Sequence, residues 1–257
     1  MNNIYKQFNE AGFYIAKNLL DQKSICKTNE SVKQHFDNQL MLLGSKLPKD
    51  IFDSMKLLHH LDIERYKKTV GSLWRKMSIY NLLHHANIQQ FVDENFGIKD
   101  IVISGGQVLH VQSESLRIPG GYFGLPAHQD FPSVNGSLDG FVVWVALQNV
   151  DKDRYPMEII PYSHTKGIFP TFKNEHSVME ISHDCYVESD FKPVLCDVGD
   201  VVFMSNFLVH RSSQQGDGGL KLACSTRYCN ADEPSFINRC YPSAYIRTVD
   251  REQYKQS

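Results

Sequence analysis

The stretch that decides the fold is "GLPAHQDFPSVNGSLDGFVVWVAL", residues 124–147. It sets a His and an Asp two residues apart, His128 and Asp130, shortly before an apolar run with strand character. If both residues lie on an extended strand, their side chains point to the same face. The pair would then direct an imidazole nitrogen and a carboxylate oxygen at one point, which is two-thirds of a facial metal triad.

A later histidine can complete this triad. His210 follows an apolar run in "VVFMSNFLVHRSS", residues 201–213, and precedes a polar loop. Two histidines and one carboxylate hold Fe(II) on one face and leave the remaining positions open for substrate and oxygen. Adjacent histidines on the predicted helices, such as His59 and His60, diverge by about 100° and do not share a metal. We therefore expect His128, Asp130 and His210 to be the ligands.

The composition favours a soluble enzyme of one domain. The chain has 257 residues and a formal net charge of −2, which disfavours nucleic acid and anionic membranes as partners. Its longest apolar run, residues 141–147, is too short to span a bilayer. The N-terminus lacks the pattern of a signal peptide, and the six cysteines suggest no disulfide framework. We expect reduced thiols and a cytoplasmic location.

The chain divides into a helical and a β-rich part. Apolar residues at helical spacing predict helices after Asp21, after Asp50, around residues 73–80 and over residues 88–96. From residue 101 onward, short β-rich runs alternate with turns rich in Gly, Pro, Asn and Asp. We expect a mainly β fold with helices, a jelly roll or barrel. Residues 1–97 would be helical support, 98–235 the jelly-roll core and 236–257 a C-terminal tail of one catalytic domain.

Several segments together resemble the phytanoyl-CoA dioxygenase family of Fe(II)/2-oxoglutarate oxygenases. They are the stretch quoted above, "FNEAGFYIAKNLL" (8–20), "MEIIPYSHTKG" (157–167), "VGDVVFMSNFLVHRSS" (198–213) and "KLACSTRY" (221–228). The resemblance implies a double-stranded β-helix, with a strand within residues 12–19. It also implies Fe(II), 2-oxoglutarate and O2 as reactants, succinate and CO2 as products, and hydroxylation of an unactivated C–H bond.

The family also implies a cation for the far carboxylate of 2-oxoglutarate. An Arg usually stands eleven residues after the second His, but here that position is Lys221, and Arg227 follows six residues later. Lys221 and Arg227 share one face of the predicted strand, about 20 Å apart. The count favours Lys221, whereas the planar guanidinium of Arg227 suits a carboxylate better. Ser212 matches a family position that contacts the same carboxylate.

Other residues are candidates for the pocket wall, and the substrate is less constrained. Trp144 faces the site in relatives, and Gln107, His110 and Gln112 lie on the strand before the motif. A carboxylate at Asp130 argues against halogenation, which needs a small residue there. We expect a small polar substrate, a sugar or amino-acid derivative, and a monomer or homodimer. The alternatives are a cupin-like metalloenzyme that does not use 2-oxoglutarate, and a non-catalytic jelly-roll binding module.

Overall fold

A computed structural model describes residues 3–121, 123–175 and 179–243. Its larger sheet is antiparallel and has six strands, in the order β1–β9–β4–β11–β2, with β3 also paired to β11. The strands are β1 (Phe13–Ala16), β2 (Ile101–Ile103), β3 (Val108–Gln112), β4 (Phe141–Ala146), β9 (Val201–Ser205) and β11 (Lys221–Asn230). The run at 101–112 is thus two short strands, and the strand expected within residues 12–19 is β1.

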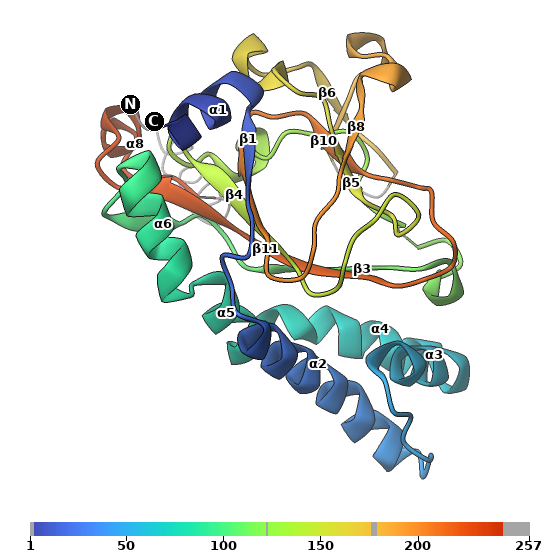
Figure 1. The fold of residues 1–257 in the computed structure, drawn as a ribbon. Helices are drawn as coiled ribbons and strands as arrows, with labels where there is room; N and C mark the ends of the chain where they lie inside the picture. Colours follow the sequence, from blue (N-terminus) through green and yellow to red (C-terminus); the bar gives the residue numbers. More distant parts are fainter. Residues whose placement is uncertain (1–2, 122, 176–178, 244–257) are drawn as a thin grey trace, which may run out of the picture.

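A smaller antiparallel sheet faces the larger one (Figure 1). It has the order β10–β5–β8 and consists of β5 (Met157–Ile159), β8 (Lys192–Val194) and β10 (His210–Ser212). A separate hairpin joins β6 (Thr171–Lys173) to β7 (Met179–Ile181). The architecture is jelly-roll-like, as expected, but the two sheets do not close into a continuous barrel among the residues described.

Both faces of the larger sheet are buried, which explains why β4 is apolar throughout. Phe141, Val143 and Val145 pack into the core shared with the helices. Val142 and Trp144 point the other way, into the core between the two sheets. Successive strand residues face opposite sides, so a strand covered on both faces reads as a continuous apolar run. The space between the sheets is where the inward-facing residues meet.

Helices from the first hundred residues pack on the outer face of this sheet (Figure 1). They are α1 (Asn3–Ala11), α2 (Gln22–Leu42), α3 (Ile51–Leu61), α4 (Ile63–Ser72), α5 (Met77–Leu83) and α6 (Ala86–Phe96). The side chains of Asp21 and Asp50 cap α2 and α3 as expected, and Gly97 ends α6 at φ 69°. The helix expected around residues 73–80 is instead a 3-10 turn at Leu73–Arg75 followed by α5. Helix α4 was not expected.

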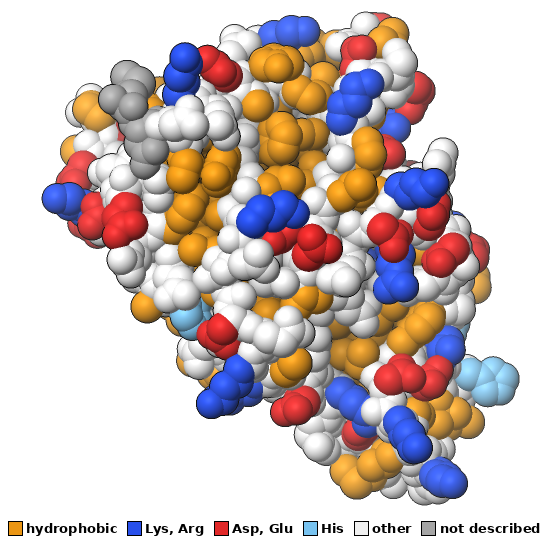
Figure 2. Space-filling view, in the orientation of Figure 1, with side chains coloured by type: hydrophobic (Ala, Val, Ile, Leu, Met, Phe, Trp, Pro, Cys, Tyr) orange, Lys and Arg blue, Asp and Glu red, His pale blue; other side chains and the backbone are white. Residues whose placement is uncertain are grey.

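Two short helices complete the fold. Helix α7 (Phe131–Val134) directly follows Asp130, and α8 (Pro234–Asn238) closes the described part of the chain. The expected tail therefore begins inside α8, and its residues 244–257 lie outside the described residues. In the face shown in Figure 2, positive and negative side chains are interspersed. Within the described ranges, no helix is both long and apolar enough to cross a membrane.

Candidate metal centre

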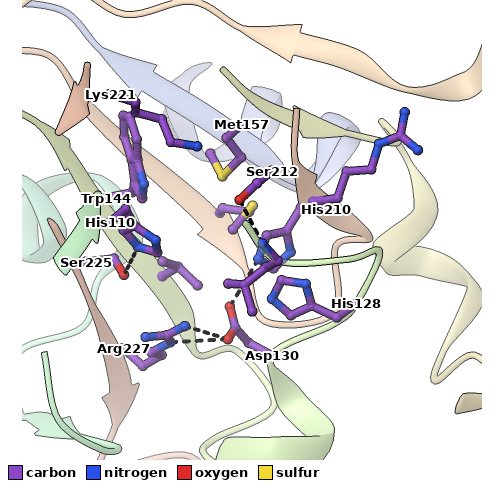
Figure 3. Close-up of a pocket in the computed structure, with 14 residues that line it drawn as sticks. His110, His128, Asp130, Trp144, Met157, His210, Ser212, Lys221, Ser225 and Arg227 are labelled. Carbon is purple, nitrogen blue, oxygen red and sulfur yellow. Dashed lines mark hydrogen bonds and ion pairs between the residues drawn. The ribbon is translucent and has the colours of Figure 1, made fainter. Parts of the chain in front are cut away.

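The three expected ligands converge between the two sheets (Figure 3). His128, Asp130 and His210 are all buried, and one ligand atom from each lies within 4.8 Å of the others. The His210 Nε2 atom is 3.6 Å from Asp130 Oδ2. Asp130 Oδ2 is buried and has no hydrogen-bond partner in the described structure. A buried carboxylate oxygen without a partner is costly, and a cation is the group that would satisfy it.

The local backbone differs from the strand expected for the first two ligands. His128 does pair with His210, through a bridge in which each backbone N–H donates to the other's carbonyl, at 2.9 and 3.0 Å. Asp130, however, has helical dihedral angles and stands at the start of α7. The two side chains therefore meet because the chain turns into a helix after His128. The structure brings the predicted pair together, but the extended geometry assumed for Asp130 was wrong.

The two imidazoles are oriented and neutral, as metal ligands must be. The Nδ1 atom of His128 bonds to the Pro126 carbonyl at 2.7 Å, and that of His210 to the Leu208 carbonyl at 3.0 Å. Both contacts leave Nε2 to face the site, the outer-shell arrangement usual for metal-bound histidines. Burial lowers the pKa of both rings, that of His210 to about 3. Neutral rings offer a lone pair at neutral pH.

Arg227 binds the carboxylate of the triad. Its Nη2 atom donates to Asp130 Oδ1 at 2.7 Å and its Nε at 3.2 Å. Burial alone would raise the pKa of Asp130, but Arg227 and the two histidines outweigh it and hold that pKa well below its usual range. One carboxylate oxygen is thus engaged by the guanidinium while the other faces the histidines.

Lys221 lies at the other end of the same pocket (Figure 3). It is 4% exposed, and no hydrogen bond or ion pair reaches its ammonium from the residues that the structure describes. Burial lowers its pKa to about 7, against a small opposing effect of Glu158. Its side chain shares the inner face of β11 with Ala223, Ser225 and Arg227, as the two-residue rule predicts.

Of the other residues predicted for the pocket, three line it, one lies beside it and one lies elsewhere. Trp144, His110 and Ser212 line it, with His110 Nε2 3.0 Å from Ser225 Oγ. Gln112 lies beside it in an adjoining groove. Gln107 was expected at the pocket but is instead next to His84 on the helical side, with their side-chain nitrogens 3.5 Å apart. Gln107 lies between β2 and β3, two residues after Gly105. The alternation of side-chain directions along β3 therefore does not extend to it.

Two residues outside the predicted ligands and pocket residues also shape the site. Gln129 has its Nε2 atom 2.8 Å from the Gly167 carbonyl and accepts a bond from Phe169 N, which ties the metal motif to the following loop. Gly124 has φ 89°, and a Cβ atom there would approach Ser212 Cβ to 2.7 Å. This close approach lets Leu125 N donate to Ser212 Oγ at 3.0 Å. A glycine shortly before His128 was the sequence feature that could have indicated this close contact.

Two facing antiparallel sheets with a buried His-Asp-His group between them define a jelly-roll metalloenzyme of the non-haem type. Residues 8–218 match the family model described as "Phytanoyl-CoA dioxygenase (PhyH)". The chain belongs to this family. Membership and the His-Asp-His group together make it an iron- and 2-oxoglutarate-dependent oxygenase.

Solved structures with a similar fold have low sequence identity to this chain. One is "non-heme monooxygenase; ThoJ apo", with TM-score 0.61 and 18% identity, over 89% of this chain and 77% of that one. Another is the "alpha ketoglutarate dependent carbocyclase SnoK" of nogalamycin biosynthesis, with TM-score 0.61 and 15% identity, over 90% and 85%. A third is the epimerase SnoN with Fe3+, alpha ketoglutarate and nogalamycin RO, with TM-score 0.60 and 14% identity, over 89% and 82%. No curated protein sequence matches the chain.

Proposed function

We propose that the protein hydroxylates an unactivated C–H bond, using Fe(II) held by His128, Asp130 and His210. This proposal rests on the buried triad, which has a carboxylate oxygen without a hydrogen-bond partner and two neutral imidazoles. Such a ligand set is typical of non-haem Fe(II) oxygenases and leaves coordination positions open. The carboxylate at Asp130 also argues against halogenation.

We further propose that Lys221 binds the far carboxylate of 2-oxoglutarate and that Arg227 positions Asp130. Arg227 already donates two bonds to Asp130, so its guanidinium is engaged. The Lys221 ammonium is buried in the same pocket without an anionic partner. A buried cation is stabilised by a carboxylate, and that contact excludes water. The Ser212 hydroxyl accepts from Leu125 N and retains its own proton to donate.

When bound, iron together with 2-oxoglutarate and O2 would supply the oxidant that removes hydrogen from the substrate. One oxygen atom of O2 would enter succinate as CO2 is released, and the other would enter the hydroxylated product. The chain's own residues provide orientation and a dry pocket. The carbonyls at Pro126 and Leu208 fix the imidazole rings, and Arg227 fixes the carboxylate. Trp144 and Met157 form apolar wall beside the triad, which restricts water.

The outcome after hydrogen removal depends on where the substrate carbon is held. Two neighbours of the same fold are named as a carbocyclase and an epimerase. Desaturation or ring closure at this site would therefore use the same ligands with a different substrate pose.

The test is an anaerobic titration of the Fe(II) protein with 2-oxoglutarate, followed by its visible metal-to-ligand charge-transfer band. We expect a saturable band in the wild type and none in His210→Ala, with unchanged circular dichroism. Loss of a ligand should weaken iron binding by more than about 100-fold, the upper range for losing an outer-shell partner. A wild-type protein that holds iron yet shows no band would contradict the proposed binding of 2-oxoglutarate at this site.

A further inference from the structure

A second, much larger space adjoins the metal pocket. It is a groove of about 670 Å³ between α4 and the edge strand β3, which lie side by side in Figure 1. The loop that leads from β3 to the metal motif forms its far wall, through residues such as Leu116, Ile118 and Phe123. Its volume lies within the range of about 300–1,000 Å³ usual for small-molecule sites.

The groove opens directly into the metal pocket. Four residues line both spaces: His110, Leu125, Ser212 and Lys221. The space beside the triad has a volume of only about 20 Å³. That is room for about one water molecule, so the space has to widen even for 2-oxoglutarate, to which the proposed function assigns it. A primary substrate therefore has to keep most of its body outside the triad pocket, and the groove is the adjoining space large enough to hold it.

The lining of the groove is mainly apolar. Val70 of α4, Val108 of β3 and Phe123 of the loop contribute carbon-rich surface. Polar groups gather at the end near the metal, where Gln112 is 3% exposed. Its Nε2 atom donates to the Ser213 carbonyl at 2.7 Å, but its Oε1 atom is buried without a partner. The groove therefore offers mainly apolar contact along its length.

Gly71 keeps the α4 side of the groove open. It lies within α4, where glycine is less favourable than alanine because it loses more backbone freedom. Its φ is not in the left-handed region, and a Cβ atom built there would meet nothing within 4 Å. Local backbone geometry therefore does not require glycine. The consequence of its missing side chain is a wider groove.

We propose that this groove binds the primary substrate, that the substrate has an extended apolar body, and that Gly71 sets the size of body accepted. This departs from the sequence-based expectation of a sugar or amino-acid derivative. It rests on the proposed function, because it assigns the groove to the substrate of that same iron site.

The experiment measures binding of N-phenyl-1-naphthylamine, a neutral apolar probe, by its fluorescence. The anaerobic protein with Fe(II) and 2-oxoglutarate is compared with Gly71→Phe and the matched control Gly71→Ala. We expect one equivalent to bind the wild type with a Kd on the order of 10 µM. Gly71→Phe should weaken binding at least about tenfold by filling the groove, whereas Gly71→Ala should change it less than about twofold.

The charge-transfer band with 2-oxoglutarate is recorded for each protein and separates the possible outcomes. The proposal is overturned if the wild type shows no saturable probe binding, or if Gly71→Phe binds as tightly as wild type while its band is intact. Absence of the band from all three proteins, with iron bound, would instead refute the proposed function and with it the assignment of the groove to a substrate. Weakened probe binding with an intact band supports the proposal.

Discussion

Toward its two ends, β11 carries the two cations of the site, the buried Lys221 and the partly buried Arg227, and they differ in what they face. At the Arg227 end, the guanidinium is 2.7 Å from Asp130 and the charges compensate each other within the protein. At the Lys221 end, the residue is 4% exposed, and its ammonium makes no hydrogen bond or ion pair with the residues that the structure describes. The strand thus presents one satisfied cation and one unsatisfied cation to a single pocket.

Under the proposed function, Arg227 holds the Asp130 carboxylate in place, whereas Lys221 is available to bind an anionic ligand. A buried ion pair is disrupted at large cost when one partner is removed, because the other charge remains buried and unpaired. A buried cation without a partner is destabilised by the loss of its hydration in the free protein. An anionic ligand that binds beside it compensates this unfavourable free energy. The comparison therefore predicts opposite consequences when each charge is replaced by a methionine of similar size.

The largest expected effect is on stability. In the metal-free protein, Arg227→Met should lower the free energy of unfolding by about 3 kcal/mol, because it leaves Asp130 unpaired. Lys221→Met should raise it by about 1 kcal/mol, because an apolar side chain replaces an unpaired cation. Denaturant unfolding at pH 7 measures both, with coincident fluorescence and circular dichroism transitions as the check on two-state behaviour.

Addition of a divalent metal ion is the control for the stability measurements on these two variants. A saturating divalent cation should recover much of the stability lost in Arg227→Met, since it compensates the Asp130 charge in place of the guanidinium. Two variants with the same sign of stability change would contradict the distinction between the two ends of β11.

The triad could be predicted from the sequence, because ligand type and spacing are local features. The structure brings His128, Asp130 and His210 together as predicted, even though Asp130 is not on the expected strand. The apolar run of β4 likewise predicted a strand, and the two-residue rule on β11 predicted which of its residues share a face. Spacing cannot reveal a turn into a helix such as α7, which depends on how the chain continues after Asp130.

The roles of Lys221 and Arg227 could not be separated in this way. The two-residue rule places both on one face, and only the fold brings Asp130 to the Arg227 end. Helix α4 was missed because its apolar positions are few and a glycine interrupts them near its end. In the sequence, Gly71 indicates only a less stable helix. In the structure, Gly71 borders a groove formed by segments that are distant in the chain.

The next largest effect is on co-substrate affinity. Lys221→Met should raise the Kd for 2-oxoglutarate about 100-fold, corresponding to about 3 kcal/mol for loss of one partner of a buried charge pair. Arg227→Met should change it less than about threefold once iron is saturating, because its bonds go to Asp130. The charge-transfer titration reports both constants. A larger effect at Arg227 than at Lys221 would reverse the proposed roles.

The smallest expected effect is a pH dependence carried by the Lys221 end alone. Burial lowers the pKa of Lys221 to about 7, so the ammonium is increasingly deprotonated in the free protein above that pH. Only the protonated form attracts a carboxylate, so the Kd for 2-oxoglutarate should rise by up to about tenfold per pH unit above 7 and level off below it. The carboxylate in turn raises the pKa in the complex, and binding takes up a proton.

Lys221→Arg tests the assignment of this pH dependence, because a guanidinium stays protonated over the whole range. Its Kd should be flat between pH 6.5 and about 8.5, while the wild type varies. His110 also lines the pocket, but burial lowers its pKa to about 3, so it remains neutral throughout and adds no slope. A slope that persists in Lys221→Arg would mean that another group titrates on binding, and Lys221 would no longer be the residue that distinguishes the two ends of the strand.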